Sequence, residues 1–139
     1  GVSFTNAKSI PSAVIDYTTQ VANRSVLPQL PDALFVTNPV PPQLILYVGD
    51  MAGPGSGPVV FAQGTRSSQL ACTFGGIADG TDCIEFSNNN GASFNYQPVP
   101  DADGYDVAVT HIRIRPQGSM APALVQPSSF VLRYRMKVK

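Results

Sequence analysis

The chain has 139 residues, of which 13% are charged, and its nine Lys and Arg balance its nine Asp and Glu. This length suits a single domain over residues 1–139 with one core, and the zero net charge provides no field toward nucleic acid or an anionic membrane, so neither is expected as a partner. The 13 Pro and 12 Gly are too many for a helical bundle, whereas 43% hydrophobic residues are too many for a disordered chain. No apolar stretch approaches the roughly 20 residues that span a bilayer, so no membrane insertion is expected.

Apolar and polar side chains alternate with a period of two along most of the chain, as in half-buried β-strands. The first predicted strand is AVIDYTTQVAN, residues 13–23, whose two rows are Ala13, Ile15, Tyr17, Thr19, Val21 and, on the opposite face, Asp16, Thr18, Gln20. Further strands are predicted at 33–37, 43–49, 59–62, 69–74, 83–87, 92–97, 107–115 and 130–138. In the last strand the core-facing row should be Phe130, Leu132, Tyr134, Met136 and Val138.

The segments between these strands carry turn residues, in NPVPP, GPGSGP, GGIADGTD, NNNGA and RPQGSMAP. NNNG, residues 88–91, predicts a hairpin turn because Asn and Gly tolerate positive φ. Strands spaced 8 to 12 residues apart with such turns predict an all-β fold, a β-sandwich of about seven to nine antiparallel strands.

The two cysteines, Cys72 and Cys83, are flanked by strand-like residues. No second Cys pair is present, and a single His cannot complete a zinc site. A Cys72–Cys83 disulfide is therefore expected, closing a loop of about ten residues worth about 2 to 3 kcal/mol in the chain-entropy model. A structural disulfide implies an oxidising compartment.

The sequence starts at Gly1 without an initiator Met, as expected of a chain from which a signal peptide has been removed. A chain cut at this point for another reason would look the same. With the disulfide, this start favours an extracellular or cell-surface location.

Several motifs, in order, resemble one known family. They are AKSIPSAVIDYTTQVANRS, NPVPPQLILYVGD, GSGPVVFAQGTRSSQL, IEFSNNNGASFNYQPVPDADGYDVAVTHIRIRPQGSM and FVLRYRMKVK. Over nearly the whole chain they are similar to the bacterial conserved-repeat module called domain of unknown function eleven. Val21 and Asn23 match its VxN element, whereas Asn38 stands where its DPxP turn has Asp, and Arg24-Ser25 replaces a common Thr-Gly or Ser-Gly step. The resemblance implies an immunoglobulin-like sandwich that serves, often in tandem, as a non-catalytic spacer, stalk or adhesive element of secreted or surface proteins.

The loop PDADGYD offers three carboxylates, Asp101, Asp103 and Asp106, around Gly104. This D-x-D-G-x-D spacing is how calcium loops are often built, although the bidentate Glu is missing and the only Glu of the chain, Glu85, is expected on a strand. The alternative is a turn whose Asp side chains bind their own backbone. Calcium is thus the one candidate cofactor, and otherwise none is expected.

No arrangement of residues predicts catalysis. Three Asp on one polar turn should stay ionised, whereas paired-carboxylate hydrolysis needs one raised pKa across a cleft. His111 follows Thr110 directly, and neighbouring strand residues should point to opposite faces, so we expect no contact between them. GPGSGP and FGGIADG lack the lysine and the helix of a phosphate-binding loop. The protein is predicted not to be an enzyme.

Cations gather on one face of two predicted strands, Arg113 and Arg115 on one, and Arg133, Arg135, Lys137 and Lys139 on the other. If these strands pair, all share one surface, which could bind acidic glycans or the acidic loops of another copy at Asp79, Asp82 and residues 101–106. The alternative is a solvated outer face that discourages edge-to-edge aggregation. Asn23-Arg24-Ser25 fits a glycosylation sequon, and the alternative is a strand end.

The segment GVSFTNAKSI, residues 1–10, alternates Val2 and Phe4 with small polar residues. It either begins its own sandwich or adds a strand to the sheet of a neighbouring copy. A head-to-tail contact of that kind does not close and gives a fibre. The leading hypothesis is a structural subunit of an extracellular fibre, pilus or surface assembly whose partner is itself, and the alternative is an adhesin or glycan-binding module.

Overall fold

The computed structural model describes residues 11–139. This part of the chain folds into eight β-strands: β1 (Val14–Asn23), β2 (Val36–Pro39), β3 (Leu44–Tyr47), β4 (Val60–Gln63), β5 (Ile84–Ser87), β6 (Tyr105–Asp106), β7 (His111–Ile114) and β8 (Ser128–Val138). All strand pairs are antiparallel. No helix between residues 11 and 139 is long and apolar enough to cross a membrane.

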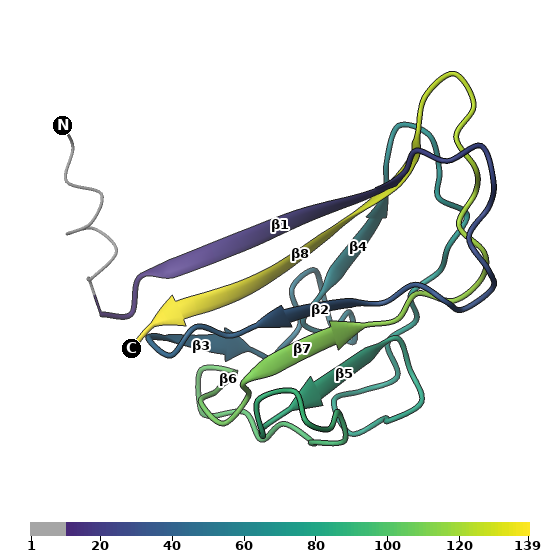
Figure 1. The fold of residues 1–139 in the computed structure, drawn as a ribbon. Helices are drawn as coiled ribbons and strands as arrows, with labels where there is room; N and C mark the ends of the chain where they lie inside the picture. Colours follow the sequence, from purple (N-terminus) through teal and green to yellow (C-terminus); the bar gives the residue numbers. More distant parts are fainter. Residues whose placement is uncertain (1–10) are drawn as a thin grey trace, which may run out of the picture.

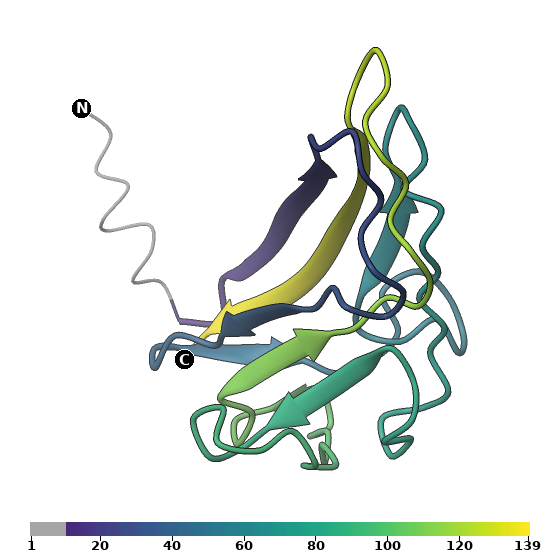
Figure 2. The same ribbon diagram turned by 45° about the vertical axis from the view of Figure 1, so that its right-hand side comes forward.

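The strands form two sheets (Figures 1 and 2). The large sheet has five strands in the order β1-β8-β3-β6, with β4 also on β8, and the small sheet has three in the order β2-β7-β5. β8 is the centre of the large sheet, because β1 covers the full length of one edge while β3 and β4 share the other. The predicted all-β sandwich is confirmed.

The core lies between the inner faces of the two sheets. The row predicted for the last strand, Phe130, Leu132, Tyr134, Met136 and Val138, is buried as expected. The small sheet contributes Ile84, Phe86, Ile112 and Ile114 from β5 and β7. The inner row of β8 recurs at every second residue, so period-two patterning alone was enough to predict it. The predicted disulfide is present and joins Cys72 to Cys83, directly before β5.

Two ends of the sandwich matter for function. At one end, here called the foot, β1 begins and β8 ends. At the other end, here called the tip, the loop after β1 (residues 24–33) lies beside the loop before β8 (residues 119–127), at the upper right of Figure 1. The loops are joined by backbone hydrogen bonds from Ala123 to Ser25 (2.7 Å) and from Gln29 to Met120 (3.0 Å).

Two predicted strands are not strands in the structure. Residues 92–97 make one backbone bond to β5, from Tyr96 to Phe86, because the Asn89 side chain instead accepts the Ser93 N–H and donates to the Ser93 hydroxyl. Residues 69–74 contain one isolated bridge, at Ala71. The NNNG segment does turn, with positive φ at Asn90 (61°) and Gly91 (83°), but it joins no pair of strands, because β5 pairs with β7 instead, so the predicted hairpin is not formed.

The other strand boundaries shift by a few residues. The predicted 107–115 strand shortens to His111–Ile114, and the two-residue β6 had not been predicted. β6 follows the acidic loop and pairs with β3 through a long-range contact that no local pattern indicates.

Candidate functional site

The acidic loop is organised by Asp101. Its Oδ1 accepts backbone N–H groups from Asp103 and Tyr105, both at 2.9 Å, and its own N–H binds the Tyr105 carbonyl (2.8 Å). The backbone hydrogen bond from Tyr105 lowers the pKa of Asp101. Gly104 has φ of 89°, which a side chain would disfavour. These contacts are those of a turn.

The third carboxylate of the loop serves a different purpose. Asp106 is buried and accepts hydrogen bonds from the Tyr96 hydroxyl (2.7 Å), the Val99 N–H (2.8 Å) and the Ala108 N–H (2.9 Å). Burial is the main cause that raises the pKa of Tyr96, and the hydrogen bond to Asp106 raises it further. Asp106 therefore fastens three segments. Over residues 11–139 no group of three or more His, Cys, Asp or Glu side chains is arranged to hold a metal ion, so the calcium hypothesis gains no support from this geometry.

The glycine-rich loops hold carboxylates of their own. Asp50 accepts the N–H groups of Gly55 (2.9 Å) and Gly57 (2.8 Å), and the first of these bonds is the main cause that lowers the pKa of Asp50. These two loop amides, which would be needed to hold a phosphate, are thus occupied. This role of Asp50 was not predicted, although its position shortly before the GPGSGP loop was a usable signal.

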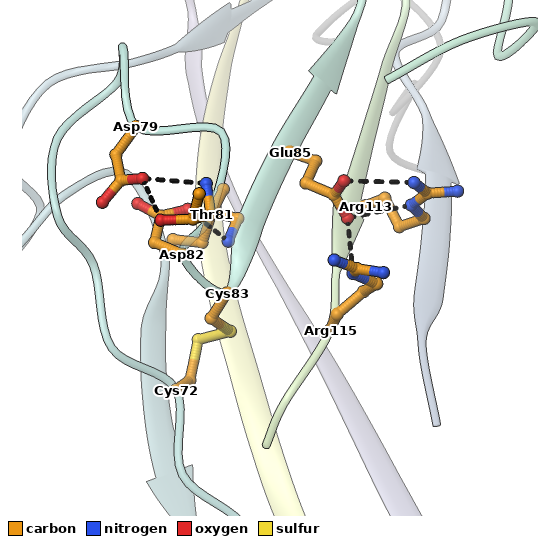
Figure 3. Close-up of polar contacts among 9 residues, drawn as sticks. Cys72, Asp79, Thr81, Asp82, Cys83, Glu85, Arg113 and Arg115 are labelled. Carbon is orange, nitrogen blue, oxygen red and sulfur yellow. Dashed lines mark hydrogen bonds and ion pairs between the residues drawn. A yellow bond between two sulfur atoms is a disulfide. The ribbon is translucent and has the colours of Figure 1, made fainter. Parts of the chain in front are cut away.

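The loop closed by the disulfide is likewise held by hydrogen bonds to its own carboxylates (Figure 3). Asp82 accepts N–H groups from Gly75 and Ile84, both at 2.9 Å, and burial raises its pKa. Asp79 accepts from the hydroxyl and the N–H of Thr81, and the hydroxyl contact is the main cause that lowers the pKa of Asp79. Both carboxylates are engaged by hydrogen bonds within their own loop, and these bonds compete with any contact to another copy.

The predicted basic surface does not form, because the strands that carry its cations do not pair. β7 lies in the small sheet between β2 and β5, whereas both edges of β8 are occupied by strands of the large sheet. A strand has only two edges, so no edge of β8 remains for β7. The pairing on which one shared basic surface depended is therefore absent, and the cations are divided between the two sheets; they are Arg113, Arg115, Arg133, Arg135, Lys137 and Lys139.

Four of these cations form ion pairs with a carboxylate on the same sheet, two arginines to each carboxylate. Glu85 faces both Arg113 and Arg115 (Figure 3). Its carboxylate makes two contacts of 3.1 Å with the Arg113 guanidinium and one of 2.8 Å with that of Arg115. The Arg113 guanidinium also lies 4.2 Å from the ring centre of Phe94.

On the large sheet Asp16 receives Arg133 and Arg135, and the contact with Arg135 (2.6 Å) is the main cause of its lowered pKa. Lys137 lies 4.2 Å from the ring centre of Tyr105. Asp16 was predicted only as a solvent-facing residue, because its partners are more than a hundred residues away.

His111 and Thr110 do meet, contrary to expectation. The His111 Nδ1 is 3.3 Å from the Thr110 hydroxyl, because Thr110 precedes β7 and does not follow strand alternation. The same hydroxyl binds the Ser87 carbonyl (3.2 Å) and accepts the Asn90 N–H (2.9 Å). The hydroxyl therefore fastens the NNNG turn, and within residues 11–139 no carboxylate contacts the ring to complete a catalytic triad.

The sequon residue Asn23 is 5% exposed. Its Nδ2 donates to the carbonyls of Leu27 (3.0 Å) and Ala121 (3.1 Å), and its Oδ1 accepts the N–H of Ser25 (2.9 Å). The amide nitrogen that glycosylation would modify is used to join the two tip loops, which matches the strand-end alternative.

β1 is an edge strand whose outer side is unpaired within the part of the chain that the structure describes. The Val138 N–H binds the Ala13 carbonyl (2.9 Å), so alternate residues from Ala13 onward direct their backbone toward β8. The intervening residues direct their N–H and C=O groups away from the sheet; they are Val14, Asp16, Thr18, Gln20 and Ala22. This edge is ten residues long.

Nothing in β1 blocks pairing with another chain. Its register against β8 is uninterrupted, without a bulge, and it contains no Pro or Lys. Its only charge, Asp16, is engaged by arginines of β8. The other edges are less open, because β2 is short and contains Pro39, while Tyr96 covers part of β5. The predicted assembly residues Val2 and Phe4 lie outside the described residues.

A scan against protein-family models, a search of curated proteins and a search of solved structures found no match to this chain.

Proposed function

We propose that this protein is a non-enzymatic structural subunit of an extracellular fibre, pilus or surface assembly, which polymerises by β-strand complementation. The long unpaired edge of β1 is the observation that carries the proposal. An exposed edge of this length is a template for another strand unless charges, Pro or bulges blunt it, and β1 has none of these protections on its free side. The inner row of β1 is only half-buried, so an added strand would also cover apolar surface.

The donor in this proposal is residues 1–10 of another copy. Val2 and Phe4 alternate with Ser3 and Thr5, which is the pattern of a strand with one apolar face. Pro11 and Ser12 form a turn before β1, with φ of 64° at Ser12. The Cys72–Cys83 disulfide is compatible with an extracellular protein.

The contacts of the acidic side chains within residues 11–139 support the same role. The carboxylates at 50, 79, 82, 101 and 106 bind their own loops, and Glu85 and Asp16 are bound by arginines. The resemblance to the conserved-repeat module, with its immunoglobulin-like sandwich, is part of the proposal. A module of that kind is a building element.

Assembly of the full chain tests the proposal. Electron microscopy and sedimentation velocity should show fibres for the native sequence. Val2→Asp with Phe4→Asp should leave monomers, because two carboxylates on the inner row cannot enter an apolar surface. Ser3→Asp with Thr5→Asp is the matched control, since it adds the same charge to the other face and should still assemble. A native chain that stays monomeric at high concentration, or equal assembly of both variants, would overturn the proposal.

The alternative, an adhesin or glycan-binding module, has less support. Four of its six candidate cations are engaged by Glu85 and Asp16, and of the six only Lys137 and Lys139, at the end of β8 and directly after it, have no carboxylate partner among the described residues. Binding to an acidic glycan that is lost on Arg133→Glu with Arg135→Glu would favour it.

A further inference from the structure

Exposed aliphatic side chains, here called the aliphatic cluster, lie on the two loops at the tip of the sandwich. Its members are between 69% and 103% exposed, and they are Val26, Leu27, Leu30, Leu124 and Val125. They come from two loops that are fixed to each other by backbone bonds and by the buried side chain of Asn23. Single exposed apolar residues need no explanation, but several gathered on one end mark an interaction surface.

The direction in which a donor strand runs along β1 decides what covers this cluster. Residue 10 of the donor is attached to the foot of its own copy, where β1 begins. If the donor runs antiparallel to β1, residue 10 lies near the foot of the acceptor. The two feet then face each other, each copy can donate to the other, and the pair closes as a dimer.

If the donor runs parallel to β1, residue 10 lies at the tip of the acceptor instead. The foot of the donating copy then sits on the tip, and the contact repeats without closing. The lengths agree, since ten extended residues span about 33 Å, as does the ten-residue β1. Only this direction covers the aliphatic cluster, whereas the antiparallel dimer leaves it in water.

We propose that residues 1–10 of one copy pair in parallel with the free edge of β1 in the next, and that the aliphatic tip of the acceptor is the seat for the foot of the donor. The foot presents Val14, which is 55% exposed, together with the exposed Pro42. The occupant of the tip is thus a second copy of this chain. The inference rests on the proposed function, because it takes residues 1–10 as the donor, and it adds the acceptor direction and the second contact surface.

Charge on the tip tests the second surface. Leu27→Asp with Val125→Asp should raise the concentration needed for assembly at least tenfold, while the melting temperature of the monomer stays unchanged because both side chains are exposed. Val99→Asp with Val107→Asp is the matched control, as these valines are also exposed (71% and 65%) but lie beside β6. Equal assembly of the two variants would overturn the role of the tip.

Cross-linking between different chains tests the direction. Ser9→Cys chains are mixed with chains carrying either Ala22→Cys, near the tip, or Val14→Cys, near the foot, which lie about 26 Å apart along β1. Parallel pairing predicts disulfide-linked heterodimers with Ala22→Cys only. Fibres that give the Val14→Cys product, or neither product, would overturn the inference and leave the fibre function standing. A native chain that never assembles would overturn both.

Discussion

Glu85 on β5 and Arg113 on β7 are direct cross-strand partners, and two hydrogen bonds of 3.1 Å join the carboxylate to the guanidinium. The Glu85 side chain is 9% exposed, whereas that of Asp16 in the corresponding cluster of the large sheet is 33% exposed. Each carboxylate binds two arginines. The chain thus contains two ion clusters of the same composition that differ in burial.

Removing the charge of each carboxylate should therefore have unequal effects. Glu85→Gln should lower the free energy of unfolding by about 1 to 3 kcal/mol, because it weakens charged hydrogen bonds at a buried position. Asp16→Asn should cost less than about 1 kcal/mol, since water screens its contacts. Chemical denaturation of the two variants measures this. A larger loss for Asp16→Asn would contradict the burial argument.

The acid side of the stability profile should depend on Asp16. Its folded-state pKa lies below the ordinary 3.8, mainly through the hydrogen bond from Arg135. Its stabilisation is complete above pH 3.8 and is lost as the pH falls through the folded-state pKa. The native chain should therefore lose more stability than Asp16→Asn on acidification through that range, as denaturation at several pH values would show.

Asp82 gives the opposite dependence of stability on pH. Burial raises its folded-state pKa, so its ionisation weakens the folded state as the pH rises from 3.8 through that value. The contribution of Asp16 is therefore measured as the difference in unfolding free energy between the native chain and Asp16→Asn at each pH. Stability profiles of the two chains that stay parallel across this pH range would contradict the contribution assigned to Asp16.

The Cys72–Cys83 bridge should stabilise the chain by about 2 to 3 kcal/mol, because it restricts the unfolded state across a short loop. Cys72→Ser with Cys83→Ser should show this loss in denaturation. Reductant should destabilise the native chain and leave the double variant unchanged. A reductant-insensitive native chain would contradict the bridge.

The acidic loop should behave as a turn. Melting temperatures with calcium and with chelator should be equal, and Asp103→Asn should change little, because the Asp103 side chain makes no hydrogen bond within the described residues. Asp101→Ala should lower the free energy of unfolding more than Asp103→Asn does, because it removes the acceptor for two loop amides. A chelator-dependent melt that Asp103→Asn abolishes would instead establish calcium binding.

The sequence predicted the features that depend on local patterns. The buried row of β8 follows from period two, the NNNG turn from residues that accept positive φ, and the disulfide from the pairing of the only two cysteines. These require no knowledge of which strands are neighbours.

Features that depend on long-range pairing were predicted poorly. The face that Arg113 and Arg133 occupy could be read locally, but whether their strands pair could not, and they lie in different sheets. The Asp16 and Glu85 clusters were missed for the same reason. Residues 92–97 look like a strand, yet the Asn89 side chain competes for the backbone N–H of Ser93.

The most direct test of the account is Thr18→Pro in the full chain. The Thr18 N–H points away from β8, so proline there removes no bond of the large sheet but blocks a strand from adding to the edge. Thr18→Val, which keeps the N–H, is the control, and hydrogen exchange of the β8 amides verifies folding of both variants. Strand complementation on β1 predicts that folded Thr18→Pro stays monomeric while Thr18→Val forms fibres; fibres from folded Thr18→Pro equal to those of the native chain would contradict it.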